Sequence, residues 1–383
     1  MESKRLEAWR SLTTPAAVAA RQSWVRETVQ RMIGPFPARC DLDPRVTGGF
    51  DRADYRVELV IFDSRPGFPV TATLYVPRGD GPFPAVVVPC GHSANGRMVE
   101  GYQRAHIGFV KQGFVVLAYD PISQGERIQY LDDAGQPTIG NCCHEHCMAG
   151  NQLALTGGSM ANIRIWDGIR AHDYLLTRGE VDPQRVAVAG NSGGGTLSTF
   201  LLCLDERYAA GSPNCYITTL VHRIATRMAA DSEQQFVPML LEGIDHADLL
   251  LPAAPKPVQI GAALRDFFPI DGTRRTTADL QRVYEVLGAG DKMTIATTDN
   301  VHGWDKTLRE AATMWFNRHL RGVDEPYEEP DFPVEDDPTL FATRTGQVLT
   351  SVPGALGIHE IVKRDAPPKL ACRAAADPVA ATR

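Results

Sequence analysis

Ser192 is the residue of this 383-residue chain whose neighbours most clearly indicate covalent chemistry. It lies in Gly190-Asn191-Ser192-Gly193-Gly194, which matches the pattern G-x-S-x-G, although a chain with 34 glycines can also place this pattern in a simple tight turn. The apolar run RVAVAG before the serine predicts a buried strand, and GTLSTFLLCL after it predicts a helix. A sharp turn from strand to helix exposes a serine beside the free N–H groups of the helix N-terminus. This context predicts that Ser192 is a nucleophile.

A serine hydroxyl needs a base that takes its proton and an acid that orients the base. After a serine of this kind, the acid and then the histidine are expected further along the chain. His302 follows the apolar run KMTIATTD and is the predicted base, with a plain surface-loop histidine as the alternative. The loop after PVQIGAAL offers Asp266 and Asp271. We predict Asp266 as the acid because it comes first after the strand, whereas Asp271 is expected to cap the next helix.

Two further loops are expected to support this chemistry. In PCGHSANG, after the first parallel strand, an N–H of Gly91 or His92 would join the N–H of Gly193 in stabilising an oxyanion. The His92 side chain fits a substrate contact and a hydrogen-bonded loop residue equally well. In AYDPISQGER, Asp120 ends a buried strand and is expected to bind nearby loop N–H groups rather than to react.

The stretch NCCHEHCMAGNQ packs cysteines and histidines of metal-binding type into Cys142–Cys147. Structural zinc usually takes its ligands as two separated pairs, and adjacent cysteines do not easily face one ion. We therefore predict no metal and no other cofactor, and a loop at the mouth of the site. His144 and His146 in this loop, and Trp304 beside the predicted base, are candidate substrate contacts.

The elements that must position these residues have an α/β pattern. The runs PAVVVPCGH, GFVVLAYD, RVAVAGNS, PVQIGAAL and KMTIATTD are continuously apolar, as is typical of strands buried on both faces of a parallel sheet. The segments IRIWDGIRAHDYLL and GTLSTFLLCLDERY are long enough to be crossover helices. Residues 55–61 and 70–76 alternate between apolar and polar types, which predicts an antiparallel hairpin that leads into the sheet.

No repeat or low-complexity linker divides the central part of the chain, so we expect a single large domain with additions. In the N-terminal addition, Thr14 and Pro15 mark a helix start and Gly34-Pro35 its end. The predicted parts are a helical arm (1–50), an α/β domain (51–321) with a small helical cap insertion that sets access to the serine (221–251), and a C-terminal tail (322–383).

Composition and charge limit the classes of partner. A hydrophobic content of 43% can fill a sizeable core, and a formal charge of -7 without a basic patch argues against nucleic acid and anionic membranes. The N-terminus has no apolar signal region, and the eight cysteines do not form a disulfide framework, so we expect a cytoplasmic protein. The expected partner is a small-molecule ester, and the sequence is compatible with a homo-oligomer.

Six stretches carry a resemblance to a known family: VDPQRVAVAGNSGGGT, IWDGIRAHDYLLTR, AYDPISQGER, IGAALRDFFPIDGTRR, DNVHGWDKTLREAATMWFNRHL and TRTGQVLTSVPGA. Together they resemble bacterial acetyl xylan esterase-like α/β-hydrolases, relatives of the dienelactone hydrolase group, over most of the chain. The resemblance implies an α/β-hydrolase fold with a mostly parallel central sheet and helices on both faces.

The same resemblance implies a carboxylic-ester hydrolase in which Ser192, Asp266 and His302 form the triad. A small acylated sugar or a related metabolite is the expected substrate. Two alternatives remain: an amidase or peptidase of the same fold, and a non-catalytic binding protein with a vestigial triad.

Overall fold

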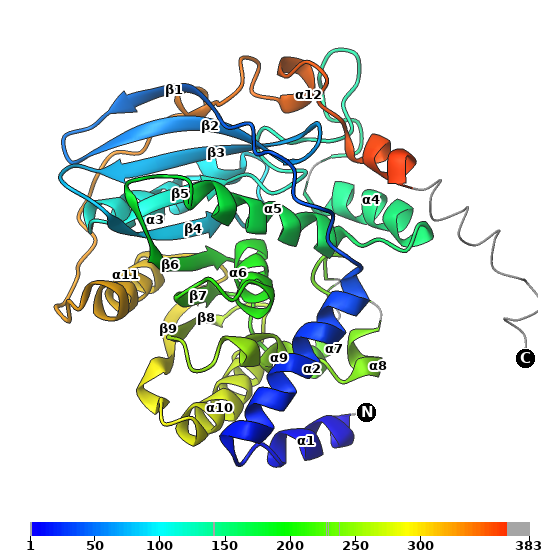
Figure 1. Ribbon diagram of the computed structural model, residues 1–383, viewed down its shortest axis with the longest axis vertical. Coiled ribbons are helices and arrows are strands. Elements are labelled where there is room, and N and C mark those ends of the chain that lie inside the picture. The colour runs from blue at the N-terminus through cyan, green and yellow to red at the C-terminus, as the bar shows by residue number, and fades with distance from the viewer. Residues whose placement is uncertain (1, 141, 227, 229, 237, 366–383) are drawn as a thin grey trace, which may run out of the picture.

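A nine-stranded sheet forms the centre of the computed structural model, which describes residues 2–140, 142–226, 228, 230–236 and 238–365 (Figure 1). The spatial order of the strands is β1-β2-β3-β5-β4-β6-β7-β8-β9. The strands are β1 (Arg45–Asp51), β2 (Tyr55–Arg65), β3 (Phe68–Pro77), β4 (Phe83–Pro89), β5 (Val115–Tyr119), β6 (Val181–Asn191), β7 (Ala210–Asn214), β8 (Val258–Arg265) and β9 (Met293–Val301).

The sheet changes from antiparallel to parallel along its width. Strands β1, β2, β3 and β5 pair antiparallel in turn, whereas β5, β4, β6, β7, β8 and β9 all pair parallel. The hairpin and the buried parallel strands predicted from the sequence are both present. Because parallel strands run in one direction, the residues that follow β4, β6, β7, β8 and β9 emerge at the same edge of the sheet.

Helices cover both faces of the sheet. Contacts place α3 and α11 on one face and α5, α6 and α10 on the other. Among the described residues, no helix combines the length and the hydropathy needed to cross a bilayer. The α-helices are α1 (Glu2–Arg10), α2 (Pro15–Ile33), α3 (Glu100–Lys111), α4 (Cys143–Leu155), α5 (Met160–Leu175), α6 (Gly193–Leu204), α7 (Leu220–Ala225), α8 (Met239–Glu242), α9 (His246–Leu250), α10 (Ile270–Val286), α11 (Lys306–Phe316) and α12 (Val348–Ser351).

The two faces bury separate hydrophobic cores because successive side chains of a strand point to opposite sides. In β4, Ala85 and Val87 belong to the core under α5, α6 and α10, while Val86 and Val88 belong to the core under α3 and α11. All four side chains are fully buried. The continuous apolar run in this strand therefore reflects burial on both faces, as predicted.

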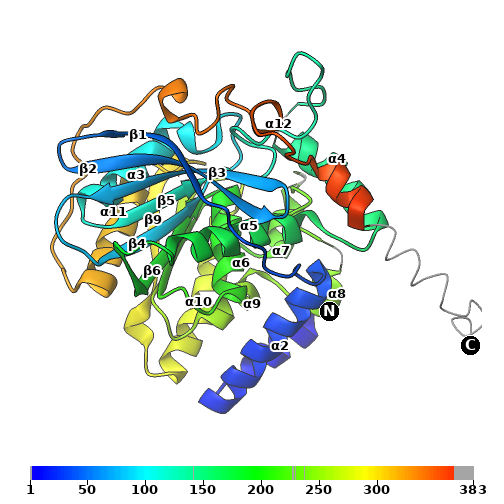
Figure 2. The ribbon, with the colours of Figure 1, turned by 45° about the horizontal axis from the view of Figure 1, so that its top comes forward.

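Helix α2 packs beside α6 and α9 (Figure 2). A buried carboxylate holds both N-terminal helices in place. Asp248 of α9 accepts hydrogen bonds from Arg5 at 2.7 Å, from Trp9 at 3.0 Å and from Arg21 at 2.6 Å. The predicted start of α2 is confirmed, since the side chain of Thr14 accepts a hydrogen bond from a backbone N–H of the first turn.

Strand β1 was not expected from the sequence, which assigned residues 1–50 to a helical arm. Residues 45–51 instead pair with β2 and extend the sheet. The sequence RVTGGFD has no regular alternation, and a side chain at Gly49 would overlap the carbonyl oxygen of Val57. The strand therefore depends on pairing with β2, which local patterning does not reveal.

Short helices occupy the region of the expected cap between β7 and β8. They are α7, α8 and α9, and Arg223 of α7 lies over the rings of Phe267 and Phe268, with its guanidinium carbon 5.5 and 4.9 Å from the two ring centres. An apolar cavity of about 250 Å³ lies among residues of α7 and α8, including Leu220 and Met239. The cap region therefore packs beside the loop that carries the predicted acid.

The part of the tail that the structure describes is anchored to the domain by two buried carboxylates. Glu329 pairs with Arg309 of α11 at 2.5 Å. Further along, Glu126 accepts hydrogen bonds from the backbone N–H groups of Ala342 at 2.8 Å and Thr343 at 2.7 Å. These contacts hold parts of residues 322–365 against the α/β domain, and residues 366–383 lie outside the described residues.

Candidate active site

Ser192 lies at the turn between β6 and α6 in a conformation that side-chain-bearing residues rarely adopt. Its φ and ψ angles are 59° and -120°. Such backbone conformations cost on the order of 1–3 kcal/mol and persist where the surrounding structure imposes them. Here the backbone N–H of Ser192 donates a 2.9 Å hydrogen bond to the carbonyl of Asn214 at the end of β7. The predicted turn from strand to helix is thus present, with the serine at its apex.

Glycines around the serine allow α6 to pack directly on the end of β4. A Cβ atom at Gly194 would overlap the carbonyl oxygen of Pro89, and one at Gly190 would lie 2.6 Å from the backbone of Gly194. Neither neighbour is the movable end of a side chain, so no larger residue fits without displacing the backbone. The close approach brings the loop at Gly91 and His92 beside the helix N-terminus.

His302 and Asp266 follow neighbouring parallel strands, β9 and β8, and contact each other. The His302 Nδ1 atom lies 2.8 and 2.9 Å from the two carboxylate oxygens of Asp266. The carboxylate side chain is 1% exposed and the imidazole 22% exposed. Because Nδ1 is bound to Asp266, Nε2 is the ring nitrogen that can accept a proton. The predicted contact between the acid and the base is therefore present.

The aromatic pair after Asp266 packs against this contact. The ring centre of Phe267 lies 4.2 Å from that of His302, and the ring centre of Phe268 lies 6.0 Å away. Exclusion of water strengthens the hydrogen bond between a carboxylate and an imidazole, because the local dielectric constant falls.

Asp271 does not cap α10, which corrects the expectation from the sequence. The helix begins at Ile270, one residue before this aspartate, and Pro269 occupies the cap position without a side-chain hydrogen bond. The Asp271 side chain is 78% exposed and pairs only loosely with Arg274, at 3.6 Å. It is therefore a surface residue of the first helical turn.

Cys215 is a member of this region that the sequence reasoning missed. It directly follows β7, has a φ angle of 49°, and its Sγ atom lies within 4.8 Å of the polar atoms of Asp266 and His302. The thiol donates to the carbonyl of Gly303 at 3.4 Å. Burial and the nearby Asp266 raise the pKa of this thiol, so it stays protonated and acts as a donor rather than a nucleophile. Its place after the run AGSPN was the signal available in the sequence.

The loop predicted to complete an oxyanion hole lies against the residue that follows the serine. A Cβ atom at Gly193 would lie 2.8 Å from the His92 ring, and Gln124 donates to the carbonyl of Gly91 at 2.5 Å. Asp120, as expected, binds loop N–H groups, including that of Arg97 at 2.9 Å. The loop is therefore fixed close to the N-terminus of α6.

The candidate substrate contacts separate into one exposed and two buried residues. His144 is exposed, whereas the side chains of His146 and Trp304 are 0% and 5% exposed. Trp304 packs on Tyr102 and Phe109 in the core under α3 and α11. Its neighbour His302 is at the site, but the indole points into the interior. The structure thus argues against direct substrate contact by His146 and Trp304.

The cluster Cys142–Cys147 lies largely on a helix, since α4 begins at Cys143, which corrects the expectation of a loop. Cys142 donates to the carbonyl of Ser93 at 3.0 Å, and Cys147 is exposed. Cys143 and His146 both approach Asp231: the polar atoms of Cys143, His92 and Asp231 lie within 4.8 Å of one another, and His146 lies 2.7 Å from Asp231. The expectation of no metal remains a prediction.

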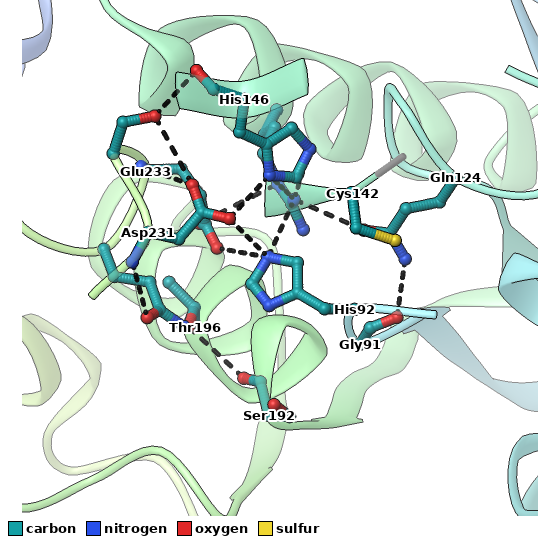
Figure 3. A network of polar contacts seen from close by, with 12 residues as sticks. Gly91, His92, Gln124, Cys142, His146, Ser192, Thr196, Asp231 and Glu233 are labelled. Atoms are coloured by element: carbon teal, nitrogen blue, oxygen red, sulfur yellow. Dashed lines mark hydrogen bonds and ion pairs between the residues drawn. The ribbon is translucent and has the colours of Figure 1, made fainter. Parts of the chain in front are cut away.

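A buried network of charged residues joins the cap to the oxyanion loop (Figure 3). Asp231 and Glu233 each lie 3.1 Å from Nε2 of His92, and Asp231 also lies 2.7 Å from His146. Burial alone would lower the pKa of His92, but hydrogen bonds with Asp231, Cys143 and Glu233 outweigh it and raise this pKa well above its usual range. The sequence reasoning missed both acids, although DSEQQ carries them together.

Comparisons with known proteins agree with this architecture. The model of the family described as acetyl xylan esterase (AXE1) matches residues 42–233. A curated relative, "Putative hydrolase YtaP" of Bacillus subtilis (strain 168), is 22% identical over 310 residues, which cover 77% of this chain and 98% of that protein.

Solved structures resemble the chain over most of its length. Methylesterase BT1017 aligns with a TM-score of 0.74 at 20% identity, over 98% of this chain and 81% of that one. A glucuronoyl esterase from Solibacter usitatus aligns with a TM-score of 0.61 at 15% identity, over 80% and 94% of the two chains. At these identities the likeness concerns the fold, which is the α/β-hydrolase fold.

Proposed function

Because the chain belongs to the acetyl xylan esterase (AXE1) family and is a carboxylic-ester hydrolase, we propose that it cleaves its substrate through an acyl-enzyme on Ser192. One observation carries the proposal. A serine strained at the apex of the turn between β6 and α6 shares an edge of the sheet with the buried hydrogen bond between Asp266 and His302. This is the combination of nucleophile, base and orienting acid that acyl transfer requires.

In the proposed reaction, His302 accepts the hydroxyl proton of Ser192 at Nε2 while the serine oxygen adds to the ester carbonyl. Asp266 holds the tautomer that leaves Nε2 unprotonated and stabilises the imidazolium that forms. His302 then gives the proton to the departing alcohol, and the acyl group stays on the serine. Water, activated by the same imidazole, releases the acid.

The negative charge on the carbonyl oxygen requires donors beside the serine. We assign this role to the N–H of Gly193 at the N-terminus of α6, together with an N–H from Gly91 or His92. Support comes from the packing of the His92 ring against Gly193, which brings the two loops together.

The substrate that we propose is a small-molecule ester, most simply an acylated sugar or a related metabolite. The family description names an acetylated carbohydrate, and the resembling structures are described as a methylesterase and a glucuronoyl esterase. The chemistry that these names share is the hydrolysis of an ester, and two of the three names include a carbohydrate.

The test compares p-nitrophenyl acetate with p-nitroacetanilide, which differ in the atom that leaves. We expect rapid hydrolysis of the ester, little of the anilide, and loss of ester hydrolysis in Ser192→Ala. Equal cleavage of the anilide would indicate an amidase or peptidase. Failure to cleave a panel of aryl and acetylated sugar esters would instead favour a binding protein.

A further inference from the structure

The network between the cap and the oxyanion loop binds the His92 imidazole on the side of the ring that faces away from Ser192. Nε2 of His92 contacts the carboxylates of both Asp231 and Glu233 at 3.1 Å. Figure 3 shows the His92 ring between Asp231 and Ser192, so that its other nitrogen, Nδ1, is on the side of the serine. Two cap residues therefore orient a ring that faces the nucleophile.

His92 is more exposed than the charged side chains that surround it. The side chains of Asp231, Glu233 and Arg164 are at most 1% exposed, whereas that of His92 is 14% exposed. A Cβ atom on Gly193 would lie 2.8 Å from Cε1, 2.9 Å from Nδ1 and 3.0 Å from Nε2 of His92. Since Gly193 directly follows the nucleophile, the His92 ring lies beside the N–H group that is proposed to stabilise the oxyanion.

The charges of the network require one additional proton. Asp231 and Glu233 carry two negative charges and Arg164 one positive charge, which leaves a net charge of -1 among buried groups. A buried uncompensated charge is costly, and a proton on one histidine removes it. His92 and His146 both contact Asp231, so they compete for this proton.

The contacts favour protonation of His92. Its ring meets two carboxylates, whereas His146 meets one carboxylate, that of Asp231, and the neutral carbonyl oxygen of Ile122 at 3.0 Å. The guanidinium of Arg164 lies 3.1 and 3.3 Å from the two ring nitrogens of His146, but contacts only one nitrogen of His92, at 3.3 Å. A positive charge on the imidazole is therefore attracted more strongly by the carboxylates and repelled less by Arg164 at His92 than at His146. This agrees with the raised pKa of His92. The other titratable groups near it are the thiols of Cys142 and Cys143.

We propose that the His92 side chain is a further catalytic residue, an imidazolium that donates a hydrogen bond from Nδ1 to the oxyanion formed when Ser192 attacks the ester. The proposal rests on the proposed acyl-enzyme mechanism. As the serine oxygen bonds to the carbonyl carbon, the carbonyl π electrons move to oxygen, and His92 stabilises that charge. The proton stays on His92, while the serine proton passes through His302 to the leaving alcohol.

Asp231 and Glu233 are then positioning residues that hold His92 protonated and fix its ring. This role predicts a kinetic signature. Activity should fall at high pH as His92 loses its proton. Removal of the Asp231 charge lowers the pKa of His92, so the alkaline limb should move to lower pH.

The first test replaces the imidazolium with a neutral side chain, His92→Gln. We expect a fall in kcat on p-nitrophenyl acetate of about 100- to 1,000-fold, as for loss of one oxyanion donor, with little change in KM. Retention of more than a tenth of kcat would overturn the proposal. A rise in KM at constant kcat would also overturn it, because His92 would then act in binding alone.

The second test is the pH profile of kcat/KM for Asp231→Asn, which we expect to show the alkaline limb displaced to lower pH. The matched control is Asp205→Asn, because Asp205 pairs with the buried His172 at 3.0 Å beyond the far end of α6. The control should keep the wild-type profile. An unmoved limb in Asp231→Asn would contradict the proposal, and Glu233→Gln provides the same measurement if the first variant does not fold.

The third test locates the proton. In protein labelled with ¹⁵N-histidine, the signals that disappear in His92→Gln should be those of a doubly protonated ring at neutral pH. A proton on His146 instead would overturn the inference. Ser192→Ala separates the two proposals: if it retains activity the serine mechanism fails, whereas an inactive Ser192→Ala beside an unaffected His92→Gln refutes only the role of His92.

Discussion

Replacement of Asp266 by asparagine removes the charge that orients the predicted base while keeping the shape of the side chain. In the wild-type protein, Oδ1 of Asp266 also accepts a hydrogen bond from the N–H of Phe268 at 3.0 Å. The side-chain oxygen of an asparagine can keep this hydrogen bond. The amide nitrogen would then face Nδ1 of His302 and donate to it. The ring proton would move to Nε2, which could no longer accept the proton of Ser192.

The magnitude follows from burial of this contact. The carboxylate is 1% exposed and contacts Nδ1 through both oxygens. Water therefore cannot easily take over the hydrogen bond to Nδ1 when the carboxylate is removed. By analogy with the same exchange in another triad, kcat should fall about 1,000- to 10,000-fold, or about 4–5.5 kcal/mol of transition-state stabilisation. Loss of the His302 contact should leave the fold intact, because Asp266 lies in a loop at the edge of the sheet.

The assay is kcat on p-nitrophenyl acetate together with the melting temperature of each variant. The control is Asp271→Asn, five residues away and 78% exposed, which should keep full activity and change stability by less than about 1 kcal/mol. Retention of a tenth of kcat in Asp266→Asn would refute the reasoning. An inactive Asp271→Asn variant would indicate that Asp271, and not Asp266, is the acid of the triad.

Four further outcomes are expected. Gly194→Ala should destabilise the fold by about 1–3 kcal/mol and impair activity, measured by denaturant unfolding and kcat, because the new methyl group meets the carbonyl of Pro89. Asp248→Ala should cost about 3–5 kcal/mol of unfolding free energy with kcat retained in the folded protein, since it leaves the buried Arg5 and the partly buried Arg21 without their shared carboxylate. Burial opposes ionisation of Asp205, but hydrogen bonds from His172 and a neighbouring arginine hold its pKa below the unfolded value. Its contribution to stability should therefore be present above about pH 4 and lost at lower pH, and Asp205→Asn should flatten acid unfolding curves in that range. EDTA should leave activity unchanged, with far less than one metal per chain by elemental analysis; zinc that resists dialysis would contradict this.

The residues that end parallel strands could be found from the sequence because local patterns mark them. Ser192, Asp266 and His302 each follow a continuously apolar run, and parallel pairing brings such ends together. Cys215 also follows a parallel strand, β7, but it was missed because the run AGSPN is too polar to be recognised as a strand. Apolar runs in the sequence therefore reveal which strand ends form the site, but they do not reveal every residue at those ends.

Contacts that depend on the cap could not be derived from the sequence. Asp231 and Glu233 lie in a segment without strand or helix periodicity, and they are separated from His92 by more than 130 residues. Their proximity follows from how the cap packs on α4 and α6. The error at Asp271 has a local cause, because Pro269 moves the helix start ahead of the aspartate.

Covalent labelling of the nucleophile tests the central claim most directly. The purified protein is treated with a fluorophosphonate, which bonds only to an activated serine, and the adduct is mapped by peptide mass spectrometry. The account predicts one adduct per chain, on the peptide that contains Ser192, and none in Ser192→Ala. An adduct on another residue, or an active enzyme that resists labelling, would contradict it.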